Sequence, residues 1–185
     1  MNLQAFSKNF PAGVSIPALL VRLLEYSNSV NRFYSGSFEL TDAGKESAIS
    51  WFDGDELAAS QFVIFGKGPD GSMYGYWLYN NKTLETAPIV FLGSEGVGCK
   101  VLANSLKDFL VLLAIGQEEL GFAGYYYDWE ENITIDENLI KFRDWLAKEF
   151  GISAPADGRA MIAEAQRNHP DLESWLDKWS ENHFG

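Results

Sequence analysis

Residues 61–78 read QFVIFGKGPDGSMYGYWL, and this stretch decides the fold. Phe62 and Ile64 in its first run, and Tyr74 and Tyr76 in its second, stand at every second position. That is the period at which side chains share one face of a β-sheet. The KGPDG segment between the runs contains residues that fix a turn's backbone angle or tolerate a positive one. The stretch therefore predicts a β-hairpin.

Further strands are predicted on both sides of this hairpin. Residues 38–40 alternate as an edge strand would, and 48–52 read as another short strand. Residues 87–92 and 99–103 follow the hairpin as core strands. Links this short cannot hold crossover helices, so the strands must pair mainly antiparallel. We expect an α+β fold with a mainly antiparallel or mixed sheet of about five or six strands, packed with helices.

Helical periodicity appears in three segments outside the sheet. Residues 15–28 carry one apolar stripe, with Ser15 as the expected N-cap. Residues 105–115 begin at a capping Ser105 and end before a glycine, and 136–150 also end before a glycine.

The C-terminal part reads as a helical extension. Residues 157–182 form two short predicted helices divided by Pro170, which we place in the first turn of the last helix. Ser153, Pro155 and Asp157 interrupt the preceding pattern. We expect an α+β domain over 1–150 and an extension over 151–185 that packs on the same domain.

Acidic residues dominate the chain of 185 residues, whose net charge is −12. Residues 1–115 carry 8 basic and 11 acidic side chains, whereas 116–185 carry 6 and 15. Such a surface repels phosphate backbones, which argues against direct nucleic-acid binding and favours a basic protein partner. Solubility alone also explains the excess of acidic residues.

Location and redox chemistry follow from what the sequence lacks. The N-terminal residues show neither a secretory signal nor a membrane-spanning run, so we expect a cytoplasmic protein without a membrane partner. Cys99 is the single cysteine, which excludes an intrachain disulfide and a thiolate zinc site. We expect Cys99 to be a small buried residue beside a strand.

Glycine patterns suggest a cofactor loop but lack its context. Gly66, Gly68 and Gly71 match the spacing of the dinucleotide fingerprint. That fingerprint needs a helix directly after its last glycine, and here an alternating strand follows. Gly93, Gly96 and Gly98 could similarly form a phosphate loop, but no lysine stands at the position that such a loop requires. We interpret both segments as turns and predict no cofactor.

Titratable residues offer little for catalysis. His169 and His183 lie in the extension without metal-ligand spacing, so we predict two solvated side chains and no metal site. Asp53, Asp55 and Glu56 form an acidic loop, and Asp128 lies in a second acidic cluster. Paired carboxylates can hydrolyse glycosides, which leaves an enzyme acting through Asp53, Asp55 or Asp128 as an alternative; it requires a concave pocket around them.

One segment, 125–131 (YYYDWEE), combines aromatic and acidic side chains. Tyrosine and tryptophan often dominate binding energy at interfaces, and acidic neighbours steer a basic partner. The candidate partner-binding residues are Tyr126, Asp128, Trp129, Glu130 and Glu131. Alternatively, the segment is a strand that buries Tyr125, Tyr127 and Trp129, or Tyr126 with Asp128.

A set of residues over 16–116 follows the pattern of a known family. These residues are Phe65, Gly66, Gly71, Ser72, Tyr74, Trp77, Pro88, Val90, Leu92, Gly93, Glu95, Gly96, Leu106, Phe109 and Leu110. Together with the order of the segments, they resemble the SUKH superfamily, which includes the yeast cell-wall (glucan) synthesis regulator and many bacterial relatives. The helix at 136–150 is compatible with the resemblance, and residues after 151 lie outside the pattern.

The resemblance implies an α+β fold without enzyme activity. Bacterial members of the superfamily resemble immunity proteins that neutralise polymorphic toxins, many of them nucleases. We therefore expect a cytoplasmic, non-enzymatic protein-binding module, an immunity protein against a nuclease-type toxin. The alternative from the same resemblance is a regulatory scaffold in cell-wall or glucan synthesis.

Overall fold

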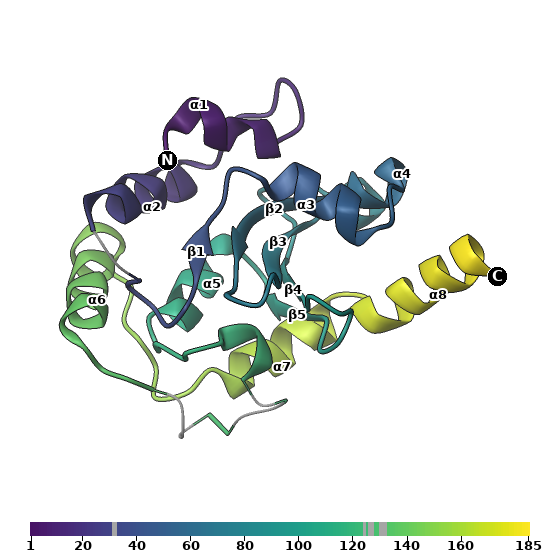
Figure 1. Ribbon diagram of the computed structural model, residues 1–185. Coiled ribbons are helices and arrows are strands. Elements are labelled where there is room, and N and C mark those ends of the chain that lie inside the picture. The colour runs from purple at the N-terminus through teal and green to yellow at the C-terminus, as the bar shows by residue number, and fades with distance from the viewer. Residues whose placement is uncertain (31–32, 124, 126–127, 130–132) are drawn as a thin grey trace.

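The computed structural model describes residues 1–30, 33–123, 125, 128–129 and 133–185. These residues form an α+β structure around a five-stranded antiparallel sheet with the strand order β1-β2-β3-β4-β5 (Figure 1). The strands are β1 (Glu39–Leu40), β2 (Phe62–Lys67), β3 (Met73–Trp77), β4 (Ile89–Leu92) and β5 (Lys100–Ala103). The α-helices are α1 (Leu3–Phe6), α2 (Ala18–Ser29), α3 (Gly44–Trp51), α4 (Glu56–Ala59), α5 (Leu106–Leu113), α6 (Glu137–Phe150), α7 (Arg159–Asn168) and α8 (Leu172–Phe184).

The predicted hairpin is confirmed as β2 and β3, which pair antiparallel with a register shift between Ile64 and Gly66. Its turn closes through a hydrogen bond from the Gly68 amide to the Ser72 carbonyl (2.8 Å). Phe62 and Ile64, however, face the opposite side of the sheet from Tyr74 and Tyr76. Both sets are buried because helices cover both faces, whereas many antiparallel sheets leave one face in water.

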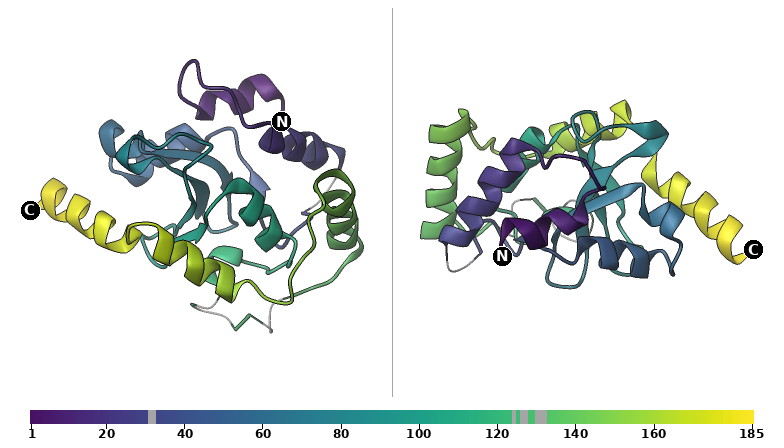
Figure 2. Two further views of the ribbon diagram at one scale, coloured as in Figure 1. Left: turned by 180° about the vertical axis from the view of Figure 1, so that it is seen from behind. Right: turned by 90° about the horizontal axis from the view of Figure 1, so that it is seen from above.

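Two apolar cores lie on the two faces of the sheet. The first core packs Val63, Phe65 and Tyr76 against side chains of α2, α5 and α6. The second packs Ile64, Trp77 and their neighbours against α3, α4 and α8. The last helix, α8, projects from the end of the molecule opposite α6 (Figures 1 and 2).

The predicted N-cap of α5 and the predicted glycine at the end of α6 are confirmed, and the structure adds an N-cap of α6 that was not predicted. Ser105 caps α5 by accepting from the Asp108 amide (3.2 Å), and Asp136 caps α6 by accepting from the Leu139 amide (2.8 Å). Gly151 ends α6 with a left-handed backbone, at φ 64°.

Two predicted helix starts are wrong. Ser15 does not cap α2, because Pro17 adopts an extended ψ of 133° and the helix begins at Ala18. Pro170 lies before α8 rather than in its first turn, and Asp171 is the N-cap. In both cases the helix starts later than the proline suggests.

The predicted strand at 48–52 is wrong: this segment is the end of α3 and the residue after it. Gly44, Ala48 and Phe52 recur at every fourth position and are buried, which is the period of a helix face. The small residues let α3 approach β2 closely. A Cβ atom on Gly44 would lie 2.1 Å from the carbonyl oxygen of Ile64, a distance that real side chains do not reach.

Gly44→Ala should therefore destabilise the protein by about 1–3 kcal/mol, because either α3 or β2 must move to admit the methyl group. Urea unfolding followed by circular dichroism measures this change. Ser50→Ala, on an exposed position of the same helix, should change the free energy of unfolding by less than about 0.5 kcal/mol. Equal stabilities of Gly44→Ala and the unmodified protein would contradict the close packing.

The extension contributes to both cores and is tied to the sheet. Ile162 of α7 joins the first core, and Leu172 and Leu176 of α8 join the second. The Tyr79 hydroxyl lies 2.9 Å from Nδ1 of His169, and Nε2 of His169 lies 3.1 Å from Oδ1 of Asn104. Since Oδ1 only accepts, Nε2 carries the hydrogen and Nδ1 of the neutral ring accepts from Tyr79. The prediction that His169 is solvated is wrong.

Stability should fall as the pH decreases from 7 to 5, through this histidine. Burial, with a smaller effect of Lys82, lowers the pKa of His169, so the unfolded chain takes up the proton first. Since the chain has two histidines, the His183→Gln background isolates the effect of His169. Thermal unfolding across this pH range should lose part of its pH dependence when His169→Gln is added. An unchanged slope would show that His169 does not couple folding to protonation.

No helix among these residues is long and apolar enough to cross a membrane.

Candidate functional site

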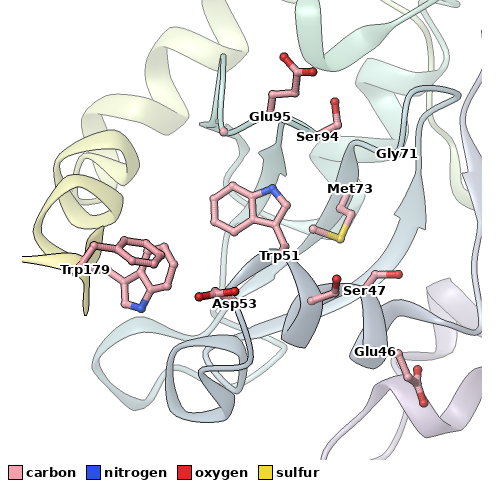
Figure 3. Close-up of a pocket in the computed structure, with 12 residues that line it drawn as sticks. Glu46, Ser47, Trp51, Asp53, Gly71, Met73, Ser94, Glu95 and Trp179 are labelled. Carbon is pink, nitrogen blue, oxygen red and sulfur yellow. The ribbon is translucent and has the colours of Figure 1, made fainter. Parts of the chain in front are cut away.

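An open groove of about 750 Å3 lies on the second face of the sheet, where segments far apart in the sequence meet (Figure 3). α3 and the turn after it form one wall, and the last two turns of α8 form another. The β2–β3 turn, β3 and the loop between β4 and β5 complete it. Its lining residues are Glu46, Ser47, Ser50, Trp51, Asp53, Gly71, Met73, Ser94, Glu95, Gly96, Trp179 and Phe184.

The two glycine segments that were predicted to be turns are confirmed as turns, and they meet at this groove. The Ser94 hydroxyl donates to Oδ2 of Asp70 (2.9 Å), and the Ser72 amide donates to its Oδ1 (3.0 Å). Partial burial alone would raise the pKa of Asp70, but the hydrogen bonds from Ser72 and Ser94 lower it. An ionised Asp70 thus holds the two turns together.

Trp51, the last residue of α3, stands in the middle of the groove (Figure 3). Its Nε1–H donates to the carbonyl oxygen of Gly93 (2.9 Å), which joins α3 to the loop after β4. Its ring lies 6.4 Å from that of Trp179 between centroids, with 29° between the planes. Two half-buried indoles from distant segments therefore provide the apolar surface of the groove.

Asp55 fixes the wall that α8 forms. Its Oδ1 accepts from the Leu57 and Ala58 amides (3.0 Å each) and so caps α4, while its Oδ2 accepts from Nε1 of Trp179 (2.9 Å). The hydrogen bonds from Ala58 and then Trp179 lower the pKa of Asp55. The carboxylate is therefore occupied by structural contacts.

His183 completes this contact near the C-terminal end of α8. Its ring stacks on Trp179 (5.2 Å between centroids, 25° between planes). Its ring nitrogens lie 3.8 Å from Oδ2 of Asp53 and 3.9 Å from Oδ2 of Asp55. These contacts become ion pairs when the imidazole is protonated. His183 is exposed as predicted, and its ring also contacts α8 and the acidic loop.

The charge of the groove has one sign. Glu46, Asp53 and Glu95 line it, and no lysine, arginine or histidine is among the described residues that do so. Figure 3 shows Glu95 and Asp53 on opposite sides of Trp51. Ionised carboxylates around an aromatic surface attract a cation through both charge and the negative ring face.

Trp179→Phe should loosen the α8 wall, because it keeps an aromatic ring but removes the hydrogen bond to Asp55. We expect faster amide hydrogen exchange in residues 179–184, measured by mass spectrometry. The matched control is Trp175→Phe, the same change on the same helix at a ring that packs on Phe52 and Phe62. If both variants accelerate exchange in 179–184 equally, the hydrogen bond does not fix this wall.

The predicted partner-binding loop is placed only in part. Trp129 is 5% exposed and belongs to the first core, and its carbonyl oxygen accepts a hydrogen bond from Nε2 of Gln117. The prediction that Trp129 is a surface anchor is therefore wrong. Asp128 is exposed, whereas Tyr126, Glu130 and Glu131 lie outside the described residues. Tyr125 is 54% exposed, so it does not share a buried strand face with Trp129.

The carboxylates of the alternative enzyme hypothesis lie in two places. Asp53 and Asp55 both face the ring of His183, and Asp53 lines the groove, whereas Asp128 lies in another loop. A general acid of a glycosidase needs a raised pKa, whereas the pKa of Asp55 is lowered. Within the described part of the chain, no group of three or more His, Cys, Asp or Glu side chains could hold a metal ion.

Cys99 is buried as predicted, beside a smaller hollow of about 180 Å3 at the start of α8. Burial raises the pKa of its thiol to about 11, which makes it a poor nucleophile. Burial also lowers the pKa of the neighbouring Lys100 to about 8, and the Lys100 ammonium donates to the Ala123 carbonyl (3.3 Å).

Sequence reasoning missed Trp51, Glu95 and the two aromatic residues of α8 that line the groove, Trp179 and Phe184. One signal was present: Trp51 lies two residues before Asp53 in an acidic loop, a combination of ring and charge like that in 125–131. The contributions of Glu95 and α8 carry no local signal, because only the folded chain brings them beside Trp51.

Comparison of the chain with models of protein families, with curated proteins and with solved structures finds no match.

Proposed function

We propose that this protein is a non-enzymatic binding module that docks a basic segment of a protein partner in the groove around Trp51. The single observation that carries the proposal is the groove's lining, which combines aromatic surface with three carboxylates and no cationic side chain among its described residues. Aromatic residues supply contact energy at interfaces, and carboxylates steer and select a basic partner. The open shape suits an inserted side chain or loop.

The partner that we propose is a nuclease-type toxin. Nucleases bind phosphate backbones through basic surfaces, which an acidic protein can cover. A net charge of −12 supports association with such a surface. The resemblance of residues 16–116 to the SUKH superfamily supports the same function, that of an immunity protein.

The binding surface that we propose differs from the predicted loop. Trp129 is buried, whereas Trp51, Trp179 and Phe184 line an open groove. The groove therefore replaces the 125–131 segment as the principal contact. The exposed carboxylate of Asp128 adds to the acidic field.

Co-expression with a candidate nuclease toxin encoded beside this chain's gene tests the function. The unmodified protein should restore growth, since occupying the basic surface of the toxin keeps nucleic acid away from it. The triple variant Glu46→Gln, Asp53→Asn, Glu95→Gln should lose protection, with an affinity lower by about tenfold or more in titration calorimetry.

A second triple variant compares the two surfaces directly. Asp128→Asn, Glu130→Gln, Glu131→Gln removes the same charge from the loop, and it should retain most of the protection. If the loop variant loses protection and the groove variant keeps it, the binding surface is the 125–131 loop. If the protein protects against none of the candidate toxins encoded beside its gene, the immunity function is contradicted. That result would favour the alternative, a regulatory scaffold in cell-wall synthesis.

A further inference from the structure

We infer that the group accepted by the groove is an arginine side chain, whose guanidinium lies flat on Trp51 and pairs with a neighbouring carboxylate. This inference rests on the proposed function, because it names the chemical group through which the basic partner binds. It distinguishes arginine from lysine, which carries the same charge.

The donors and acceptors of the groove favour a ligand that brings its own donors. Both indole N–H groups are already used, that of Trp51 by Gly93 and that of Trp179 by Asp55. The two indoles thus offer ring surface but no free N–H. Asp53 and Glu95, as ionised carboxylates, can only accept. A flat group rich in N–H donors can stack on the indole rings and donate hydrogen bonds to the carboxylates.

His183 provides a precedent within the chain. Its planar ring stacks on Trp179 while its nitrogens face Asp53 and Asp55 at 3.8 Å and 3.9 Å. When protonated, it is a planar cation held between an indole and two carboxylates. A guanidinium on Trp51, beside Asp53 and Glu95, would make the same combination of contacts.

Lysine fits this site less well for three physical reasons. A guanidinium is planar, so it stacks on an indole over its whole area, whereas an ammonium makes a point contact. Its fork of N–H groups matches a carboxylate in two hydrogen bonds. It is also more weakly hydrated than an ammonium, so bringing it against half-buried rings costs less.

Binding of three matched peptides to the full chain tests the inference. The peptides carry a fluorescent label and the sequence GSXSGXSG, where X is arginine, lysine or citrulline, and fluorescence anisotropy at low salt reports their binding. We expect the arginine peptide to bind about tenfold more tightly than the lysine peptide. The citrulline peptide, which is planar but uncharged, should bind at least tenfold more weakly than the arginine peptide.

Substitutions locate the preference. Trp51→Leu should reduce the ratio of arginine to lysine affinity to about one, because it removes the stacking surface. Glu95→Gln should weaken binding of the arginine peptide severalfold. Because Glu95 lies in an exposed loop and not in the core, this variant keeps the test valid if Trp51→Leu fails to fold. Asp144→Asn, on the exposed side of α6 at the far end of the molecule, is the matched charge control.

The outcomes separate this inference from the proposed function. Equal affinity for arginine and lysine peptides would overturn arginine selection and leave a basic partner in place. An arginine preference that survives in Trp51→Leu would also overturn it, because the groove would not be its source. Absence of binding by either cationic peptide would count against both the inference and the proposed function.

Discussion

The close contact of α3 with β2 is the constraint on which the groove depends. Gly44 leaves no room for a side chain above the Ile64 carbonyl, so α3 lies directly on the sheet. That position sets Trp51 at the end of the helix, where it reaches the Gly93 carbonyl and the ring of Trp179. A larger residue at position 44 would move the central side chain of the site as well as the core. The geometry of the groove therefore depends on how closely α3 packs on the sheet.

Asp55 links the local structure of the acidic loop to the C-terminal helix. The same carboxylate caps α4 and accepts from Trp179, across 124 positions of sequence. Each contact favours the ionised form, so the two stabilise one another electrostatically. Asp55 was a candidate catalytic residue in the sequence, and these contacts give it a structural role instead. The charge of the groove comes instead from Glu46, Asp53 and Glu95.

The extension after Gly151, which lies outside the resemblance to the SUKH superfamily, forms one wall of the groove. α8 contributes Trp179 and Phe184 to the groove, and His169 ties the start of this region to Tyr79 and Asn104. Without α8 the groove would lose one wall, and the second core would lose Leu172 and Leu176.

Local pattern in the sequence determined the hairpin, the antiparallel order of the strands, the turns at the glycine segments and the capping of α5 and α6. These features depend on neighbours in the chain, so alternation, glycine and capping side chains predict them. The segment at 48–52 was ambiguous, because a short apolar run satisfies both strand and helix periods. Only the tertiary structure decided that Trp129 is buried and that Trp51, Glu95 and Trp179 surround one groove. That result depends on which helix covers which face of the sheet, a matter of side-chain packing between distant segments that no local pattern encodes.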